Sequence, residues 1–341
     1  MPRPYIERTP LDAAFYAEHL RPRLPARIFD VHVHLNLPEH LALVPEERWR
    51  SDWALESGHL LPVEDAYTCA RELFPDARYA IAGMPWPIRE ADLAANNRYL
   101  AAKRAQGLVA PFMAVRPEWD PEAVERDLVD GGFAGFKPYG DMVSGVKGAS
   151  LSIFDFLPRR QLEILERHGR ALLLHLPRRE RVADPDNVRE LREILRRYPR
   201  VPVIVAHLGR SFCPYYLREG LRLLGPDARD LYFDTSAVIN PETFELAFGE
   251  LPVERILFGT DMPILLWHGR RTWTQREYRN LCREPFSWNQ RRESPEVEAT
   301  YSLFLYEQMK AVLDACDRHH LRPEQKDGLF WANARRVLKL G

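Results

Sequence analysis

The chain has 341 residues, with 48 Lys and Arg against 49 Asp and Glu, which gives a formal net charge of -1. Apolar residues make up 45% and charged residues 28% of the sequence. This composition is ordinary for a globular protein and excludes a disordered, collagen-like or low-complexity chain. The balanced charge argues against a dedicated nucleic-acid binder.

Apolar runs and cysteines bear on the location of the protein. No apolar run approaches the roughly 18–20 residues that span a bilayer, and residues 1–8 lack the apolar core of a secretory signal. The cysteines lie far apart with no C-x-x-C pair, which favours free thiols in a reducing compartment. We therefore expect a cytoplasmic protein that acts on a small molecule, with no nucleic-acid or membrane partner.

Short apolar runs alternate with helical patterns along the chain. The runs predict eight strands, at 27–34, 79–82, 109–115, 133–137, 171–175, 202–207, 231–235 and 255–261. Because these runs are almost continuously apolar and do not alternate with polar residues, both faces of the predicted sheet are expected to be covered.

Helical patterns fill most of the intervals between these strands. They lie at 91–105, 120–131, 161–168, 187–198 and 240–249. Asp120 and Asn240 are expected N-caps, and Gly107 and Gly169 are expected helix stops. The alternation predicts a single (β/α)8 barrel domain over residues 1–341. The rival, a doubly wound open sheet, usually carries a glycine-rich turn after its first strand, and this sequence has none there.

Two long segments follow the first and the eighth predicted strands. Residues 35–64 and 262–300 are rich in tryptophan and arginine, and the second contains Trp267, His268 and Arg271. Long connections after barrel strands lie at the face where active sites are built. We expect these segments to wall a pocket for an anionic or planar substrate, although packing against the barrel rim or a subunit contact would also explain them.

Histidines, one lysine and one aspartate stand at the ends of the predicted strands. His32 and His34 are two residues apart, so their side chains point to the same face of the first strand. The other residues that end strands are Lys137, His175, His207 and Asp261. In a barrel these ends converge, and imidazole with carboxylate suits Zn²⁺ and related divalent ions. The pattern predicts a metal site, with Asp261 also placed to take a proton from water.

Several motifs resemble those of the amidohydrolase superfamily. They are Asp30-Val-His-Val-His34, Ala206-His-Leu-Gly209, Phe258-Gly-Thr-Asp-Met-Pro263 and the C-terminal Trp331-Ala-Asn-Ala-Arg-Arg-Val-Leu338. The last is similar to the closing helix of the amidohydrolase-related branch, which includes aminocarboxymuconate-semialdehyde decarboxylase, resorcylate-type decarboxylases and lactonases. The resemblance runs from about residue 27 to the end of the chain.

The resemblance implies roles for these residues. His32, His34, His175 and Asp261 would bind the metal, and His207 would orient water or polarise the substrate as a catalytic residue alongside Asp261. Lys137 lies on the fourth strand, where some binuclear relatives carry a carboxylated lysine that bridges two metals. In that case His175 and His207 would serve the second metal. Otherwise Lys137 is a cation that binds a substrate carboxylate.

Other side chains are candidates for binding substrate. Arg210 stands where the branch often has a second glycine, and its guanidinium suits an anion. Tyr139, Trp267, His268 and Arg271 are the further candidates. The resemblance also implies a homodimer.

The expected function is a metal-dependent hydrolase that cleaves an amide, lactone or ester-like bond of a small anionic substrate. Zinc is the expected metal, as one or two ions, with manganese or iron as alternatives. The second hypothesis is a non-oxidative decarboxylase, or lyase, of an aromatic or dienyl carboxylate that uses the same ligands. A dinuclear iron or manganese oxygenase and a non-enzymatic sensor complete the alternatives.

Overall fold

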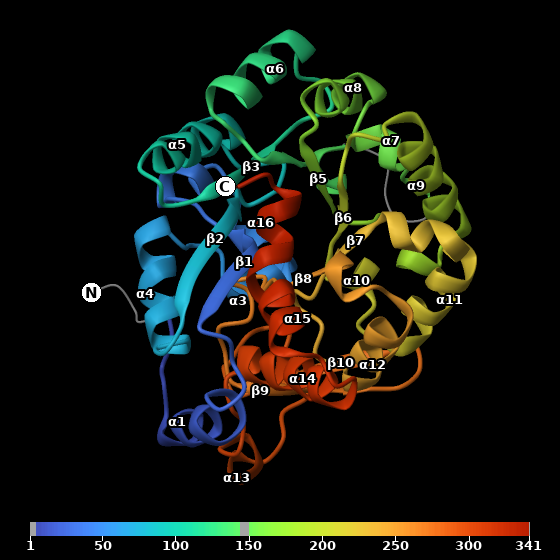
Figure 1. Ribbon diagram of the computed structural model, residues 1–341. Coiled ribbons are helices and arrows are strands. Elements are labelled where there is room, and N and C mark those ends of the chain that lie inside the picture. The colour runs from blue at the N-terminus through green and yellow to red at the C-terminus, as the bar shows by residue number, and fades with distance from the viewer. Residues whose placement is uncertain (1–4, 144–149, 341) are drawn as a thin grey trace.

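The computed structural model describes residues 5–143 and 150–340 of the chain. Within these ranges, eight parallel strands pair in chain order. The strands are β1 (Arg27–His34), β2 (Arg78–Met84), β3 (Ala110–Ala114), β4 (Gly135–Lys137), β5 (Ala171–Leu174), β6 (Val203–Val205), β7 (Tyr232–Asp234) and β8 (Ile256–Leu257). The segment after β8 returns to β1, where the Asp261 amide donates to the His32 carbonyl at 2.9 Å. The predicted (β/α)8 barrel is therefore confirmed (Figure 1).

Helices surround the barrel strands (Figure 1). The longer ones are α4 (Val63–Leu73), α5 (Leu93–Ala105), α6 (Pro121–Asp130), α8 (Arg159–His168), α9 (Pro185–Arg197), α11 (Pro214–Leu224), α12 (Pro241–Glu250) and α14 (Phe304–Arg318). The predicted caps are confirmed, because the Asp120 carboxylate accepts from the Ala123 amide at 2.9 Å and Gly169 ends α8 with a φ of 54°.

Shorter helical segments occupy the connections and the two ends of the chain. They are α1 (Pro10–Phe15), η1 (Tyr16–Leu20), η2 (Pro38–Leu41), α2 (Glu46–Ser51), α3 (Trp53–Ser57), η3 (Gly140–Met142), α7 (Ile153–Phe156), η5 (Arg181–Ala183), α10 (His207–Arg210), η6 (Gly225–Asp230), η7 (Val253–Arg255), α13 (Pro295–Glu298), α15 (Pro323–Asp327), η8 (Gly328–Ala332) and α16 (Asn333–Val337). Of these, α2 and α3 belong to the long segment after β1.

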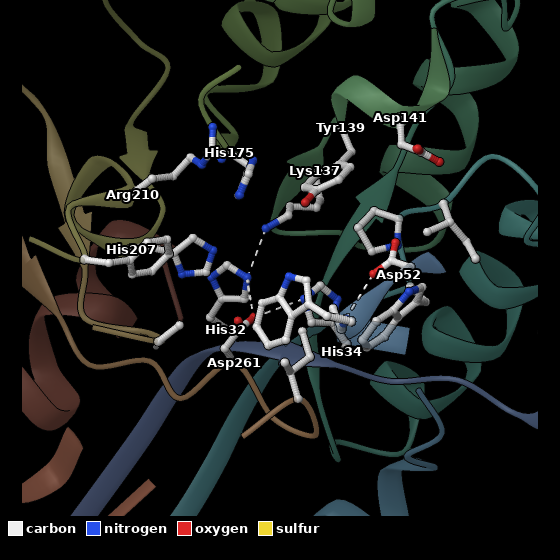
Figure 2. Close-up of a pocket in the computed structure, with 18 of the residues that line it drawn as sticks. His32, His34, Asp52, Lys137, Tyr139, Asp141, His175, His207, Arg210 and Asp261 are labelled. Carbon is white, nitrogen blue, oxygen red and sulfur yellow. Dashed lines mark hydrogen bonds and ion pairs between the residues drawn. The ribbon is translucent and has the colours of Figure 1, made fainter. Parts of the chain in front are cut away.

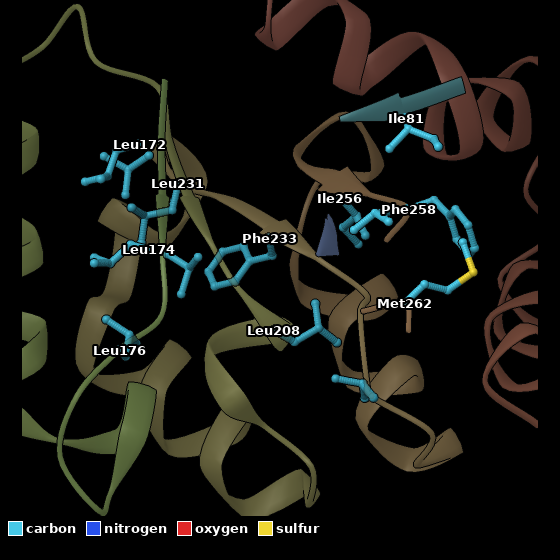
Figure 3. Close-up of a cluster of buried hydrophobic side chains, with 14 of the residues drawn as sticks. Ile81, Leu172, Leu174, Leu176, Leu208, Leu231, Phe233, Ile256, Phe258 and Met262 are labelled. Atoms are coloured by element: carbon cyan, nitrogen blue, oxygen red, sulfur yellow. The ribbon is translucent and has the colours of Figure 1, made fainter. Parts of the chain in front are cut away.

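The continuous apolar character of the strands follows from two separate cores. Leu172 and Leu174 of β5 belong to the cluster between the barrel and its helices, which Figure 3 shows together with Phe233 of β7. Leu173 of the same strand belongs to a second cluster, with Phe29 of β1. Successive side chains of a strand point to opposite faces, so both faces of these strands are buried and no polar alternation remains.

One end of the barrel is closed by the C-terminal helices. The ring of Trp331 in η8 meets that of Phe29 edge-on, with centroids 6.0 Å apart. In Figure 1 the red α15 and α16 cross in front of the strands. Because this end is covered, the open end is the one where the strands finish, and the predicted site residues lie there.

The segment 262–300 contains an antiparallel hairpin that the sequence did not predict. Its strands, β9 (Gly269–Trp273) and β10 (Tyr278–Cys282), pair Arg271 with Asn280. Gly269 and Arg271 are the buried positions at the start of β9. A strand whose buried face carries glycine and arginine shows no apolar alternation, which is the signal that predicts strands.

The predicted strand at 255–261 is longer than the observed one, because β8 ends at Leu257. The residues that follow still bond to β1, but Asp261 adopts a φ of 71°, outside the β region. This irregular backbone carries a predicted metal ligand.

Two predictions about the chain can be compared with the described residues. No helix among them combines the length and apolar character that a membrane crossing requires. The cysteines Cys69, Cys213, Cys282 and Cys316 are buried and free, as predicted.

Candidate active site

The residues predicted at the strand ends line one cavity of about 400 Å³. His32 and His34 come from β1, and Lys137 from the end of β4. His175 follows β5, His207 begins α10 after β6, and Asp261 follows β8. Figure 2 shows these side chains converging, with Tyr139 and Arg210 beside them. The convergence follows from the barrel, since the carboxyl ends of all its strands open at one face.

A tight cluster lies at the bottom of this cavity. His32, His207 and Asp261 offer ligand atoms that lie within 4.8 Å of one another. Asp261 Oδ1 is 3.4 Å from His32 Nε2 and 3.3 Å from His34 Nε2. His175 is not one of these three, and its ring centroid lies 5.4 Å from that of His207. Nitrogen and carboxylate oxygen atoms around a common point are the donor set of a divalent-metal site.

Asp234, at the end of β7, orients this cluster and was missed by the sequence analysis. Its carboxylate accepts from His32 Nδ1 at 2.9 Å, which leaves Nε2 of that ring facing the cavity. It also accepts from the His207 amide at 2.9 Å. A carboxylate behind a metal-binding histidine fixes its tautomer and raises its basicity. The available signal was an acidic residue at the end of an apolar strand.

Ser236 provides a similar support for His207. The Ser236 carbonyl accepts from His207 Nδ1 at 3.0 Å, so Nε2 of His207 faces the cavity. The Ser236 hydroxyl lies 2.8 Å from the same Nδ1 and also bonds Asp234. Both imidazoles are therefore held from behind by one connected network.

The protonation states suit metal binding. Burial, followed by the charge of Lys137, lowers the pKa of His32 to about 3, and burial also lowers the pKa values of His175 and His207. Burial opposes ionisation of Asp261, but His207, His34 and His32 together lower its pKa to about 2. Neutral imidazoles and an ionised carboxylate are the forms that bind a metal. The residues present therefore fit a divalent cation.

Lys137 lies directly against the cluster. Its side chain is 1% exposed, and its Nζ is 3.1 Å from His32 Nε2 (Figure 2). Burial lowers its pKa to about 8, although the charges of Asp234 and Asp261 oppose this shift. A lysine with a lowered pKa reaches its neutral, nucleophilic form more easily than an exposed one.

His207 and Arg210 sit in a strained turn. Left-handed φ values occur at His207 (58°), Leu208 (48°), Gly209 (72°) and Arg210 (62°). Such a conformation costs roughly 1–2 kcal/mol for each non-glycine residue. The turn brings two cavity residues to the barrel mouth within one short segment, and backbone strain of this kind clusters at functional sites.

The rest of the cavity lining includes aromatic and cationic side chains. Its aromatic residues are Trp53, Trp86, Tyr139, Phe212 and Tyr278, and its arginines are Arg48, Arg210 and Arg271. The expected pocket-lining role of the long segments thus receives structural support, since Trp53 comes from the first and Arg271 from the second.

Trp267 and His268, expected to bind substrate, do not line this cavity. Trp267 stacks on Phe304 with ring centroids 4.0 Å apart and is 1% exposed. His268 bonds Asp12 at 2.9 Å and Glu284 at 3.0 Å. Both side chains are engaged by partners that do not line the cavity, so we assign them structural roles. Tyr139, Arg210 and Arg271 line the cavity, and their contacts with substrate stay a prediction.

The fold and the cluster together define a barrel protein with a candidate metal site at its open end. A family model described as amidohydrolase matches residues 29–340. The chain belongs to this amidohydrolase family, and the predicted resemblance is confirmed. A search of curated proteins found no match.

Solved structures with the same fold include decarboxylases of aromatic carboxylates, one of which is described with bound manganese. The 2,6-dihydroxybenzoate decarboxylase in complex with 2,6-dihydroxybenzoate is 18% identical, with a TM-score of 0.54 over 93% of this chain and 99% of that one. The dihydroxybenzoic acid decarboxylase of Polaromonas sp., which contains manganese and the inhibitor 2-nitroresorcinol, is 16% identical, with a TM-score of 0.55 over 93% and 98%. The 5-carboxyvanillate decarboxylase of Sphingomonas paucimobilis is 12% identical, with a TM-score of 0.56 over 93% and 100%. At these identities the similarity establishes the fold.

Proposed function

We propose that this protein is a metal-dependent decarboxylase of a small aromatic or dienyl carboxylate. The observation that carries the proposal is the His–Asp cluster at the bottom of a cavity whose wall is aromatic and cationic. Such a wall suits a planar anion. The similar solved structures support this reaction better than the hydrolysis that the sequence analysis put first.

His32, His34 and Asp261 would hold the metal ion, with His207 or His175 as a further ligand. Zinc was the expected ion, whereas manganese is found in one of the similar structures, and we extend manganese to this chain as part of the proposal. When bound, the ion would supply Lewis acidity toward a substrate oxygen.

The chain's own residues would bind the substrate and move its proton. Lys137, at the bottom of the cavity, would attract the reacting carboxylate, and Tyr139 would contact the ring. Loss of CO2 leaves an electron pair on the ring carbon, which must take up a proton. Asp261 enters as a carboxylate, so it can take a proton from a substrate hydroxyl, or from water where the substrate has no hydroxyl, and deliver it to that carbon.

The test is release of CO2 from a panel of hydroxybenzoates and dienyl carboxylates, using the full chain loaded in turn with Mn²⁺ and Zn²⁺. We expect CO2 and the protonated product in equal amounts from at least one acid. Asp261→Asn should lower the rate at least about 100-fold, because in this proposal the group both binds the ion and transfers the proton. Cleavage of lactone or amide probes with no CO2 release from any acid would contradict the proposal.

Hydrolysis is the second candidate, and the position of Lys137 favours it. The Nζ atom lies among the metal-ligand atoms, and its lowered pKa favours the neutral amine that reacts with CO2 to form a carbamate. A carbamate there could bridge two ions, with His175 and His207 serving the second.

The two candidate functions predict different numbers of metal ions per chain and different masses of the protein. If Lys137 is carboxylated, native mass spectrometry in bicarbonate buffer should show two ions per chain and the added mass of one CO2. The Lys137→Met variant should lose both the second ion and the added mass. One ion per chain with an unmodified lysine is expected for the decarboxylase.

A further inference from the structure

We propose that Asp30 and Thr260 are positioning residues, which hold Asp261 in the strained conformation that places its carboxylate in the His–Asp cluster. This inference rests on the proposed function for the role of Asp261 and adds the two residues that act through it. Both side chains are fully buried, and neither lines the cavity. They therefore act on the site through other residues and not through a contact with substrate.

Asp261 has a backbone conformation that is unfavourable for its residue type. Its φ is 71°, in the left-handed region that residues other than glycine avoid. A change of this torsion would redirect the carboxylate, whose Oδ1 atom now lies 3.4 Å from His32 Nε2 and 3.3 Å from His34 Nε2 (Figure 2). Such a conformation persists only where the surrounding contacts hold it.

Three successive amides around Asp261 are bound by three different acceptors. The Thr260 amide donates to Asp30 Oδ1 at 3.0 Å. The Asp261 amide donates to the His32 carbonyl at 2.9 Å, and the Met262 amide donates to Thr260 Oγ1 at 3.1 Å. The turn is thus fixed at the strained residue and on both sides of it, and the side chains of Asp30 and Thr260 supply two of the three acceptors.

The Thr260 hydroxyl joins this turn to Asp30. It donates to Asp30 Oδ2 at 2.5 Å while it accepts from the Met262 amide. Asp30 Oδ1 also accepts from the His32 amide at 3.1 Å. One carboxylate therefore bonds both segments that carry candidate metal ligands, β1 with His32 and the segment after β8 with Asp261.

A further donor to Asp30 comes from β2. The Tyr79 hydroxyl donates to Asp30 Oδ2 at 2.5 Å. Each oxygen of Asp30 thus accepts two hydrogen bonds, Oδ1 from two amides and Oδ2 from two hydroxyls. Because a rotation of this buried carboxylate would leave donors without a partner, the network is rigid. We therefore expect the loss of a hydroxyl that bonds Asp30 to be felt at Asp261.

Two variants of Thr260 separate positioning from a general effect on folding. Thr260→Val keeps the shape of the side chain and removes its hydroxyl, whereas Thr260→Ser keeps the hydroxyl. Hydrogen exchange of the metal-free full chain, followed by NMR, measures how firmly the turn is held. The Met262 amide should exchange at least about 10-fold faster in Thr260→Val than in the wild-type protein, because its acceptor is gone. Thr260→Ser should stay within about threefold of the wild-type rate.

The same variants are then tested with Co²⁺. Competition with a chelator measures affinity, and the visible absorption spectrum reports the geometry of the ligands. Thr260→Val should bind Co²⁺ roughly 10- to 100-fold more weakly, with an altered spectrum, and Thr260→Ser should restore both. Asp30→Asn should also bind more weakly, because its NH2 group cannot accept from the Thr260 hydroxyl. Circular dichroism checks that each variant is folded.

Tyr79→Phe and Tyr67→Phe form a matched pair. Each removes one hydroxyl, and the two rings meet edge-on with centroids 6.3 Å apart. Tyr67 donates to the Leu108 carbonyl at 2.7 Å and not to Asp30. Tyr79→Phe should weaken Co²⁺ binding about three- to tenfold and alter the spectrum, since Asp30 loses a donor. Tyr67→Phe should leave both unchanged.

Wild-type exchange at Met262, or wild-type Co²⁺ affinity, in a folded Thr260→Val protein would overturn the inference. So would equal losses in Thr260→Val and Thr260→Ser, or in Tyr79→Phe and Tyr67→Phe, because the effect would then be general. The two proposals fail separately. If no acid releases CO2 but the variants behave as expected, the reaction is removed and the positioning role stays. If the wild-type chain binds no metal, the proposed function fails and the exchange rates decide the positioning role.

Discussion

The buried carboxylate of Asp234 holds several groups of the candidate metal site in position through hydrogen bonds. It bonds the ring of His32 and the amides of His207 and Ser236. Although burial opposes its ionisation, the charges and hydrogen bonds of His32, together with His207 and Ser236, hold its pKa well below the usual value. A permanently ionised carboxylate behind His32 keeps that imidazole in the tautomer with a free Nε2.

Replacing Asp234 by Asn should weaken metal binding by roughly 10- to 100-fold, because the amide no longer fixes and polarises the His32 ring. Competition with a chromophoric chelator measures this affinity. Asp227→Asn, at a surface residue that pairs with Arg192 at 2.7 Å, is the control and should bind metal normally. Unchanged affinity in a folded Asp234→Asn protein would show that Asp234 does not support the site.

The β9–β10 hairpin and helix α1 are joined by an ion network around the buried His268 and Asp12. Burial opposes protonation of this imidazole, but hydrogen bonds to Asp12 and Glu284 raise its pKa to about 9. The hairpin carries Arg271, so this network stabilises the element that forms part of the cavity wall.

The raised pKa has a definite consequence for stability. Because protonated His268 is favoured in the folded state, its contribution is complete below the unfolded pKa near 6.5 and is lost as pH rises through about 9. At roughly 1.4 kcal/mol per pKa unit, the loss is on the order of 3 kcal/mol. Urea denaturation from pH 6.5 to 9.5 should show this decline in the wild-type protein.

His268→Gln should be less stable than the wild-type protein at pH 6.5, since the buried Asp12 loses its cation and Glu284 keeps only Arg283, at 3.7 Å. The difference between the two proteins should shrink toward pH 9.5. The control is His320→Gln at an exposed position, which should run parallel to the wild-type protein. A constant difference between His268→Gln and wild type across this range would refute the assignment of the network.

The barrel joins segments that are far apart in the sequence at one metal site. His32 lies on the first barrel strand and Asp261 follows the last, and the Asp261 amide bonds the His32 carbonyl at 2.9 Å. A cation held between such segments binds the folded chain and not the unfolded one, so binding must raise stability.

Metal loading should therefore raise the free energy of unfolding by about 4 kcal/mol when free metal is near 1,000 times its Kd. Thermal unfolding with Mn²⁺ or Zn²⁺, compared with a chelator, measures the shift in Tm. Asp261→Asn should lose most of it. An equal shift in that variant would mean that the ion binds elsewhere.

The sequence predicted the barrel and most of the cluster because both follow from local patterns. A histidine or acid at the end of a parallel strand must lie at the barrel mouth, so His32, His207 and Asp261 could be placed without a structure. Trp267 and His268 could not, because their positions depend on long-range contacts. Asp12, the partner of His268, lies 256 positions away. Arg271 was expected at the site, but the hairpin that presents it has no apolar alternation.

Anomalous diffraction from crystals of the full chain loaded with Mn²⁺ tests the central claim most directly. We predict one peak within coordination distance of ligand atoms of His32, His34 and Asp261, with a second peak near His175 only if Lys137 is carboxylated. An intact cluster with no peak under saturating metal, or a peak bound to other residues, would contradict the metal-dependent function.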